Sequence, residues 1–101
     1  MIAVSGTLTH GIEVDGVAHK DFDLRAPTIG DAVAAIEEAG ADASFLRVKV
    51  HKIARCLVRV GTLKQGEVTA AMLLALPEED FAPLNNALDD TEKKPKALAS
   101  A

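Results

Sequence analysis

Cysteine and large aromatic residues are scarce in this chain. Of its 101 residues, one is cysteine, three are phenylalanine and none is tryptophan or tyrosine. A single thiol, Cys56, excludes an internal disulfide and is compatible with a reducing compartment. With so few aromatic rings, stacking on nucleic-acid bases is not expected.

Excess positive charge and long apolar runs are missing as well. The formal net charge is −4, so the field of the whole chain repels a phosphate backbone, and we expect no nucleic-acid partner. The longest apolar stretch, residues 70–77, is far shorter than the roughly 20 residues that span a bilayer. Residues 1–9 lack the basic and apolar regions of a signal peptide. We therefore expect a soluble cytosolic protein with no membrane partner.

The length suits one domain, and the patterns predict an α+β fold: an N-terminal β-hairpin followed by three to four α-helices packed as a small helical domain. We predict this domain over residues 1–90. Residues 91–101 contain lysines, a proline and small residues with nothing to bury, which predicts a disordered tail.

The hairpin is predicted over residues 5–24, where polar and apolar residues alternate around Asp15-Gly16. A two-residue loop would place Ile12 opposite His19 and Leu8 opposite Asp23, which wastes apolar residues. A three-residue loop with Gly16 as a bulge pairs Ile12 with Ala18 and Leu8 with Phe22. We favour the second register.

Four helices are predicted after the hairpin. The first, about residues 29–39, follows the N-cap Thr28 with Asp31 three residues on, and carries Ile29, Val33 and Ile36 on one face. The second, residues 44–60, places Leu46, Val50, Ile53 and Leu57 on one face and is capped by Ser44 or Asp42.

The third predicted helix, residues 70–75, follows Thr69. The fourth, residues 77–89, begins at Pro77, although Pro83 also allows a kink or a start near Phe81.

No set of residues predicts catalysis, a metal site or a bound cofactor. His10, His19 and His51 lie in different segments without metal-ligand spacing. Cys56 lacks a recognisable base, and a thiol inside a helix is usually a small buried hydrophobe. Gly61 and Gly66 have phosphate-loop spacing, but Glu67 and Val68 stand where lysine and serine or threonine belong. The acidic clusters lack calcium-loop spacing, and helix-terminus charge and solvation explain them.

Charge is instead segregated along the chain. Residues 43–66 contain no acid, whereas residues 67–92 contain seven acids and no base. Within the predicted second helix, Lys52, Arg55 and Arg59 recur at spacings of three and four, which predicts one basic stripe. The stripe is either an ordinary solvated face or a surface that binds an acidic protein partner.

A second candidate contact surface is the apolar segment 70–76. It is apolar around its whole circumference, and a domain of this size has difficulty burying every side of such a helix. Part of it is core, and the excess suits a groove or an oligomer contact. The candidate partner-binding residues here are Met72, Leu73, Leu74 and Leu76.

The order of these elements resembles the tail assembly chaperones of Mu-like and related long-tailed phages and prophages. The resemblance covers residues 7–90. It rests on the pattern Phe-x-Leu-Arg-x-Pro-Thr-x-Gly-Asp at residues 22–31, on a central helix with residues 55–63, and on Leu-Pro-Glu-Glu-Asp-Phe-x-x-Leu at residues 76–84.

The resemblance implies a non-catalytic protein of the bacterial host cytoplasm that binds the tape measure protein during tail morphogenesis and is absent from the mature virion. It also implies, as possible partners, a longer frameshifted form of the protein and further copies of itself. The alternative is a small adaptor or regulatory protein that dimerises through residues 70–75 and presents its basic stripe to an acidic partner.

Overall fold

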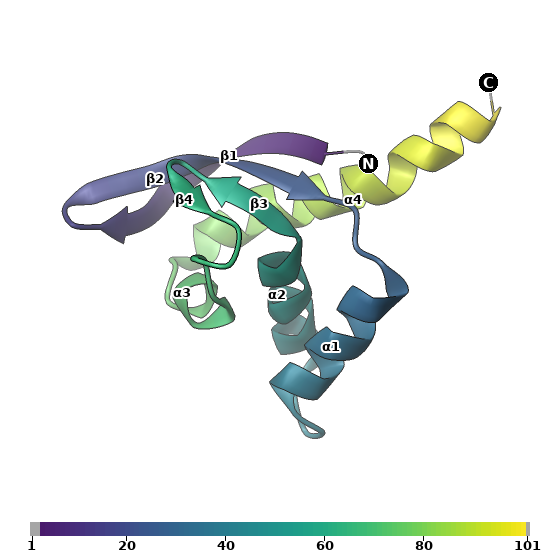
Figure 1. Ribbon diagram of the computed structural model, residues 1–101, viewed down its shortest axis with the longest axis horizontal. Coiled ribbons are helices and arrows are strands. Elements are labelled where there is room, and N and C mark those ends of the chain that lie inside the picture. Colours follow the sequence, from purple (N-terminus) through teal and green to yellow (C-terminus); the bar gives the residue numbers. More distant parts are fainter. Residues whose placement is uncertain (1–2, 101) are drawn as a thin grey trace.

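The protein folds as a four-stranded antiparallel sheet with a group of helices (Figure 1). This computed structural model describes the backbone of residues 3–100 and the side chains of residues 3–93. The elements are β1 (Ala3–Val14), β2 (Val17–Arg25), α1 (Ile29–Ala39), α2 (Phe45–Cys56), β3 (Leu57–Val60), β4 (Leu63–Lys64), α3 (Ala70–Leu74), the 3₁₀ turn η1 (Glu78–Asp80) and α4 (Phe81–Ser100). The predicted α+β class with an N-terminal hairpin is confirmed.

The hairpin turn contains two residues, so the three-residue loop that we predicted is wrong. Val14 pairs with Val17, and Ile12 pairs with His19. Asp15 and Gly16 both have positive φ, at 52° and 79°, as the tight turn that matches strand twist requires. The Asp-Gly signal located the turn correctly. The register beside the turn is set by the geometry of this two-residue turn and not by the pairing of apolar residues.

A bulge in β1 shifts the register of the hairpin away from the turn. Between the pairs Ile12–His19 and Thr7–Asp21, four residues of β1 lie opposite Lys20 alone. The extra residues bring Leu8 and Ile12 into the core together. Both of our registers assumed regular pairing between residues 8 and 12, and therefore neither anticipated this arrangement.

The bulge is held by the turn that precedes α4. The Asp80 carboxylate is fully buried and accepts hydrogen bonds from the backbone N–H groups of His10, at 2.9 Å, and Gly11, at 3.1 Å. The His10 ring also contacts the Glu79 carboxylate at 2.8 Å. A carboxylate thus satisfies two amide donors that the β1–β2 ladder leaves without partners.

The first predicted helix is confirmed as α1. Thr28 and Asp31 form a reciprocal capping box, and Gly40 ends the helix. The second helix, α2, is capped by Ser44, whose side chain accepts the N–H of Arg47 at 3.1 Å.

The predicted extent of the second helix to residue 60 is wrong, because residues 57–60 form β3. In this strand Leu57 pairs with Leu24 and Val60 pairs with Phe22, so both complete the apolar face of the sheet. Gly61, at φ 58°, then turns the chain into β4. The sequence concealed this strand, because Leu57 continues the helical spacing and the buried residues Leu57 and Val60 do not alternate, since the β2–β3 register shifts between them.

The third helix begins as predicted, because Thr69 caps α3. The predicted start of the fourth helix at Pro77 is wrong: Pro77 precedes the 3₁₀ turn η1, and α4 starts at Phe81, the alternative that Pro83 left open. The fourth helix continues past residue 89, where we predicted its end. Thr91 is fully buried and donates its hydroxyl hydrogen bond to the Leu88 carbonyl at 2.7 Å. The described backbone of residues 91–100, where we predicted a disordered tail, is helical, and the side chains from residue 94 onward lie outside the described part of the chain.

One apolar core joins the sheet to α2, α3 and α4. Its most buried large members are Phe22, Leu24, Ile53 and Leu88. In Figure 1, α1 and α2 lie side by side and project away from the sheet, while α4 runs along the strands. The opposite face of the sheet is polar, with Ser5 and Thr7 donating hydrogen bonds to Asp23 and Asp21.

Candidate protein-binding surfaces

An apolar groove opens between α2, α3 and the start of α4. Its volume is about 550 Å³. Two of its leucine side chains are exposed, Leu46 of α2 at 55% and Leu74 of α3 at 44%. The full lining is Leu46, Val50, Ile53, Leu73, Leu74, Leu76, Pro77, Glu78, Phe81 and Leu84. The groove is therefore an apolar surface that is open to solvent, and Glu78 is the one charged residue in its lining.

Three of the four apolar residues singled out from the sequence line this groove. Leu73, at 7% exposure, belongs to both the core and the groove floor, whereas Leu74 and Leu76 line its open part. Met72 is half-buried, and its sulfur accepts the N–H of Thr69 at 3.5 Å. The sequence did not single out Leu46, because its helical spacing assigned it to the core.

The predicted basic stripe is not assembled on one helix. Arg59 lies in β3, where its Nε donates to the Asp23 carboxylate at 2.8 Å. Arg55 remains in α2, but it is paired with Asp31 and Glu38. Lys52 is half-buried beside α1. The stripe prediction failed because α2 ends before Arg59.

Three cations of α2 are left without an acidic partner among the described side chains. They are Arg47, Lys49 and Lys52, none of which forms an ion pair there. The Lys49 ammonium lies 6.0 Å from the centroid of the Phe45 ring, a distance at which cation–π attraction operates. Arg47 and Lys49 thus lie among the first five residues of α2, whereas Lys52 lines a cavity on the α1 side of the helix.

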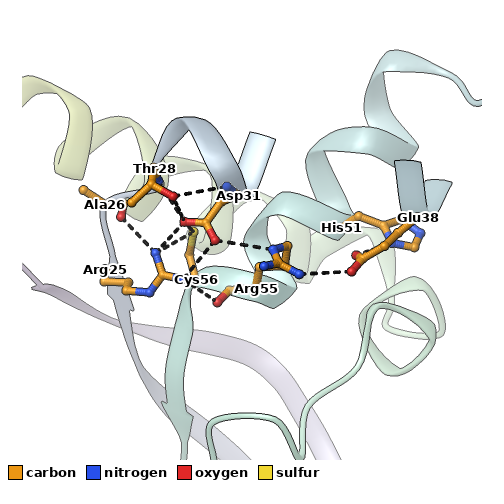
Figure 2. A network of polar contacts seen from close by, with 8 residues as sticks. All are labelled: Arg25, Ala26, Thr28, Asp31, Glu38, His51, Arg55 and Cys56. Carbon is orange, nitrogen blue, oxygen red and sulfur yellow. Dashed lines mark hydrogen bonds and ion pairs between the residues drawn. The ribbon is translucent and has the colours of Figure 1, made fainter. Parts of the chain in front are cut away.

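A polar network fixes α1 to α2 and the end of β2, as Figure 2 shows. Asp31, only 4% exposed, accepts a bidentate pair from Arg25, with Nη1–Oδ2 at 2.6 Å and Nη2–Oδ1 at 3.1 Å. Arg55 adds a contact to Asp31 at 3.3 Å and extends to Glu38 at 3.1 Å. Arg25 also donates to the carbonyl oxygen of Arg55 at 3.1 Å. Residues far apart in sequence are therefore tied together by one carboxylate.

The same contacts explain the electrostatics of the network. Hydrogen bonds from Arg25, assisted by those from Thr28, hold the pKa of Asp31 well below its usual range despite burial. On the outer face of the sheet, the hydrogen bond from Ser5 and the pairing with Arg59 lower the pKa of Asp23. Both carboxylates are therefore charged at neutral pH.

Cys56 lies at the inner edge of this network and is fully buried. Its sulfur lies 3.9 Å from the Asp31 carboxylate. Burial raises the pKa of Cys56 to about 11, so the thiol is protonated at neutral pH and is a weak nucleophile. Its location is that of a small core residue.

The three histidines lie apart from one another, each with its own contacts. His10 contacts Glu79, His51 lies 3.5 Å from Glu38, and the buried His19 packs against Gly61 while its Nδ1 accepts the N–H of Thr62 at 3.4 Å. Within the described residues, no group of three or more His, Cys, Asp or Glu side chains is placed to hold a metal ion. In the same part of the chain, no helix is long and apolar enough to cross a membrane.

A second apolar surface lies on the outer side of α1 and the start of α2. Ile29, Val33 and Ile36, which share one helix face, are 86%, 49% and 55% exposed, and Phe45 is 83% exposed. Amphipathic spacing usually marks the face that packs on the core. In α1 the buried residues are instead Asp31 and Ala35, so its apolar face points to solvent.

Comparisons of the chain with protein-family models, with curated proteins and with solved structures found no match.

Proposed function

We propose that this protein is a non-catalytic phage tail assembly chaperone that binds the tape measure protein during tail morphogenesis. The resemblance of residues 7–90 to that family supplies the partner. The groove between α2, α3 and α4 is the observation that supports binding, because it leaves Leu46 and Leu74 in water on its two sides. In this proposal the groove holds an apolar helical segment of the tape measure protein until the tail is assembled.

The shape and charge of the groove favour an amphipathic helix with acidic flanks. Leucine side chains dominate the lining, and each fully buried partner leucine would contribute about 1.5–3 kcal/mol through removal of apolar surface from water. Arg47 forms no ion pair within the described residues and lies three residues before the groove residue Val50 on α2, so it would attract carboxylates beside the apolar stripe of the partner.

The alternative of an adaptor that dimerises through α3 has less support. Leu73, the central residue of that helix, is used in the core. Two of the three basic residues proposed to bind its acidic partner, Arg55 and Arg59, are paired within the chain.

The chaperone proposal also places the protein in the host cytoplasm, outside the mature virion, with a longer frameshifted form as a further partner.

Co-expression tests this proposal. The tape measure protein of the phage or prophage that encodes this chain is expressed alone and with the full chain, and its soluble fraction is measured. We expect the chain to raise the soluble fraction and to co-purify with the tape measure protein. Unchanged solubility together with no co-purification would contradict the proposed function.

A further inference from the structure

The orientation of α1 is set by polar contacts and leaves its apolar face outside. Asp31 is held by Arg25 and Arg55, and Glu38 by Arg55 and His51, all on the side that faces α2 and the sheet. Ile29, Val33 and Ile36 cannot turn inward without breaking these contacts and leaving Asp31 buried without its partners. Solvent exposure of this face is thus built into the fold.

This exposed face continues onto α2 as one surface. A shallow cavity of about 440 Å³ lies between the two helices and is lined by Ala32, Ile36, Ala43, Phe45, Val48 and Lys52. Ile29 and Val33 extend the surface along α1. We call these eight residues the α1–α2 patch. Seven of the eight are apolar, and Lys52 is the one charged member. A largely apolar surface of this kind is typical of a site covered by another protein.

Charges of opposite sign border the two sides of the α1–α2 patch. Glu37 follows Val33 by four residues and is exposed, so it lies at the α1 edge. Lys49 follows Phe45 by four residues and contacts its ring, so it lies at the α2 edge. Neither side chain forms an ion pair within the described residues. One edge is acidic and the other is basic.

We propose that the α1–α2 patch binds the same patch of a second copy of this chain. A surface with an apolar centre, an acidic edge and a basic edge is complementary to itself under a two-fold axis parallel to the helix pair. That axis places α1 of one copy against α2 of the other, with Glu37 facing Lys49 across the interface. The two helix pairs then form a four-helix arrangement that covers Ile29, Ile36 and Phe45. An acidic or basic partner protein would match only one of the two edges.

The proposed dimer leaves the groove free. Leu46 lines the groove and Phe45 lines the patch, so adjacent residues of α2 face different surfaces. Dimerisation is therefore independent of the proposed chaperone function, and each can fail without the other. A dimer of this form would present two grooves to one long partner.

The mass of the full chain in solution tests the proposal. We expect a dimer by light scattering at micromolar concentrations. Phe45→Asp and Ile36→Asp should raise the dimer dissociation constant by about tenfold or more, as expected for the loss of apolar anchors at the centre of an interface. Both side chains are exposed, so the variants should keep the helical circular dichroism of the parent. Leu74→Asp, in the groove, is the matched control and should remain dimeric.

Charge exchange tests the two-fold geometry separately. Glu37→Lys alone and Lys49→Glu alone should each weaken the dimer, because each places like charges across the interface. The double variant E37K/K49E should restore it, because the exchange recreates two opposite pairs. A monomeric parent chain, a dimer unaffected by Phe45→Asp, or a double variant no tighter than the single ones would each overturn the proposed interface.

Discussion

Asp31 accepts a 2.6 Å hydrogen bond from Arg25, and this pair decides which face of α1 is turned to solvent. The carboxylate is 4% exposed and also closes the capping box with Thr28. Because the polar residues of α1 take the inward positions, its isoleucines and valine face outward. The two candidate binding surfaces of the molecule thus have different origins: the groove is an opening at the edge of the core, and the α1–α2 patch follows from a polar anchor.

Removing the charge of this anchor should destabilise the fold. Asp31→Asn keeps the side-chain size but leaves Arg25 and Arg55 without their carboxylate, at an expected cost of about 3 kcal/mol in the free energy of unfolding. Urea denaturation followed by circular dichroism measures this cost. Glu13→Gln, at an exposed position of β1 outside both candidate surfaces, is the control and should change the free energy by less than about 0.5 kcal/mol. Equal stability of Asp31→Asn and the parent would show that the network does not anchor α1.

The depressed pKa values of Asp31 and Asp23 predict a stability that falls in acid. Both carboxylates bind protons more readily in the unfolded chain, where their pKa is about 3.9, than in the folded one. Their contribution is therefore complete above that value and is lost as the pH falls through the lower folded pKa. Denaturation at pH 7, 4 and 3 should show a steep decline for the parent and a shallower one for Asp31→Asn. Parallel pH profiles would contradict the assignment.

Asp80 should control the order of the β1 bulge. Asp80→Ala removes both acceptors of the His10 and Gly11 amides, and leaving buried donors unpaired costs about 1–3 kcal/mol. Hydrogen exchange of those two amides should accelerate more than exchange elsewhere in β1. Glu79→Ala is the control, since that side chain is 72% exposed and contacts only the His10 ring. Exchange that stays slow in Asp80→Ala would mean that the strand holds the bulge by itself.

Cys56 should behave as a core residue in labelling experiments. Its thiol is fully buried and its pKa is raised to about 11, so reaction with a maleimide at pH 7 should be slow for the folded chain and fast in urea. The labelling rate should track the unfolded population. Rapid labelling of the folded protein would indicate an exposed or activated thiol instead.

Local sequence signals predicted the fold where one interaction dominates. Thr28, Ser44 and Thr69 located three helix starts, and Asp15-Gly16 located the hairpin turn. The end of α2 was missed because Leu57 fits the spacing of a helix as well as that of a strand. Residues 57–60 become a strand because they pair with the edge of β2, which lies far away in sequence. The bulge was missed because its cause, Asp80, lies about 70 residues away along the chain.

The candidate surfaces were predictable only where a local excess of apolar residues points to them. Residues 70–76 contain more apolar surface than a small core absorbs, and Leu74 and Leu76 of this segment line the groove, while their role in partner binding stays a prediction. The basic stripe depended on a helix that reached Arg59, and it failed with that helix. Spacing alone assigned Ile29 and Ile36 to a buried face, because the partners of Asp31 are visible only when Arg25 and Arg55 are brought together.

The affinity of the tape measure protein for groove variants tests the central claim most directly. The partner obtained by co-expression is titrated with the parent chain, with Leu74→Asp in the groove, and with Val17→Asp, whose side chain is 56% exposed in the hairpin. A carboxylate in the apolar groove should weaken binding by about tenfold or more, whereas Val17→Asp should bind like the parent. Equal affinity of Leu74→Asp and the parent would contradict binding through the groove.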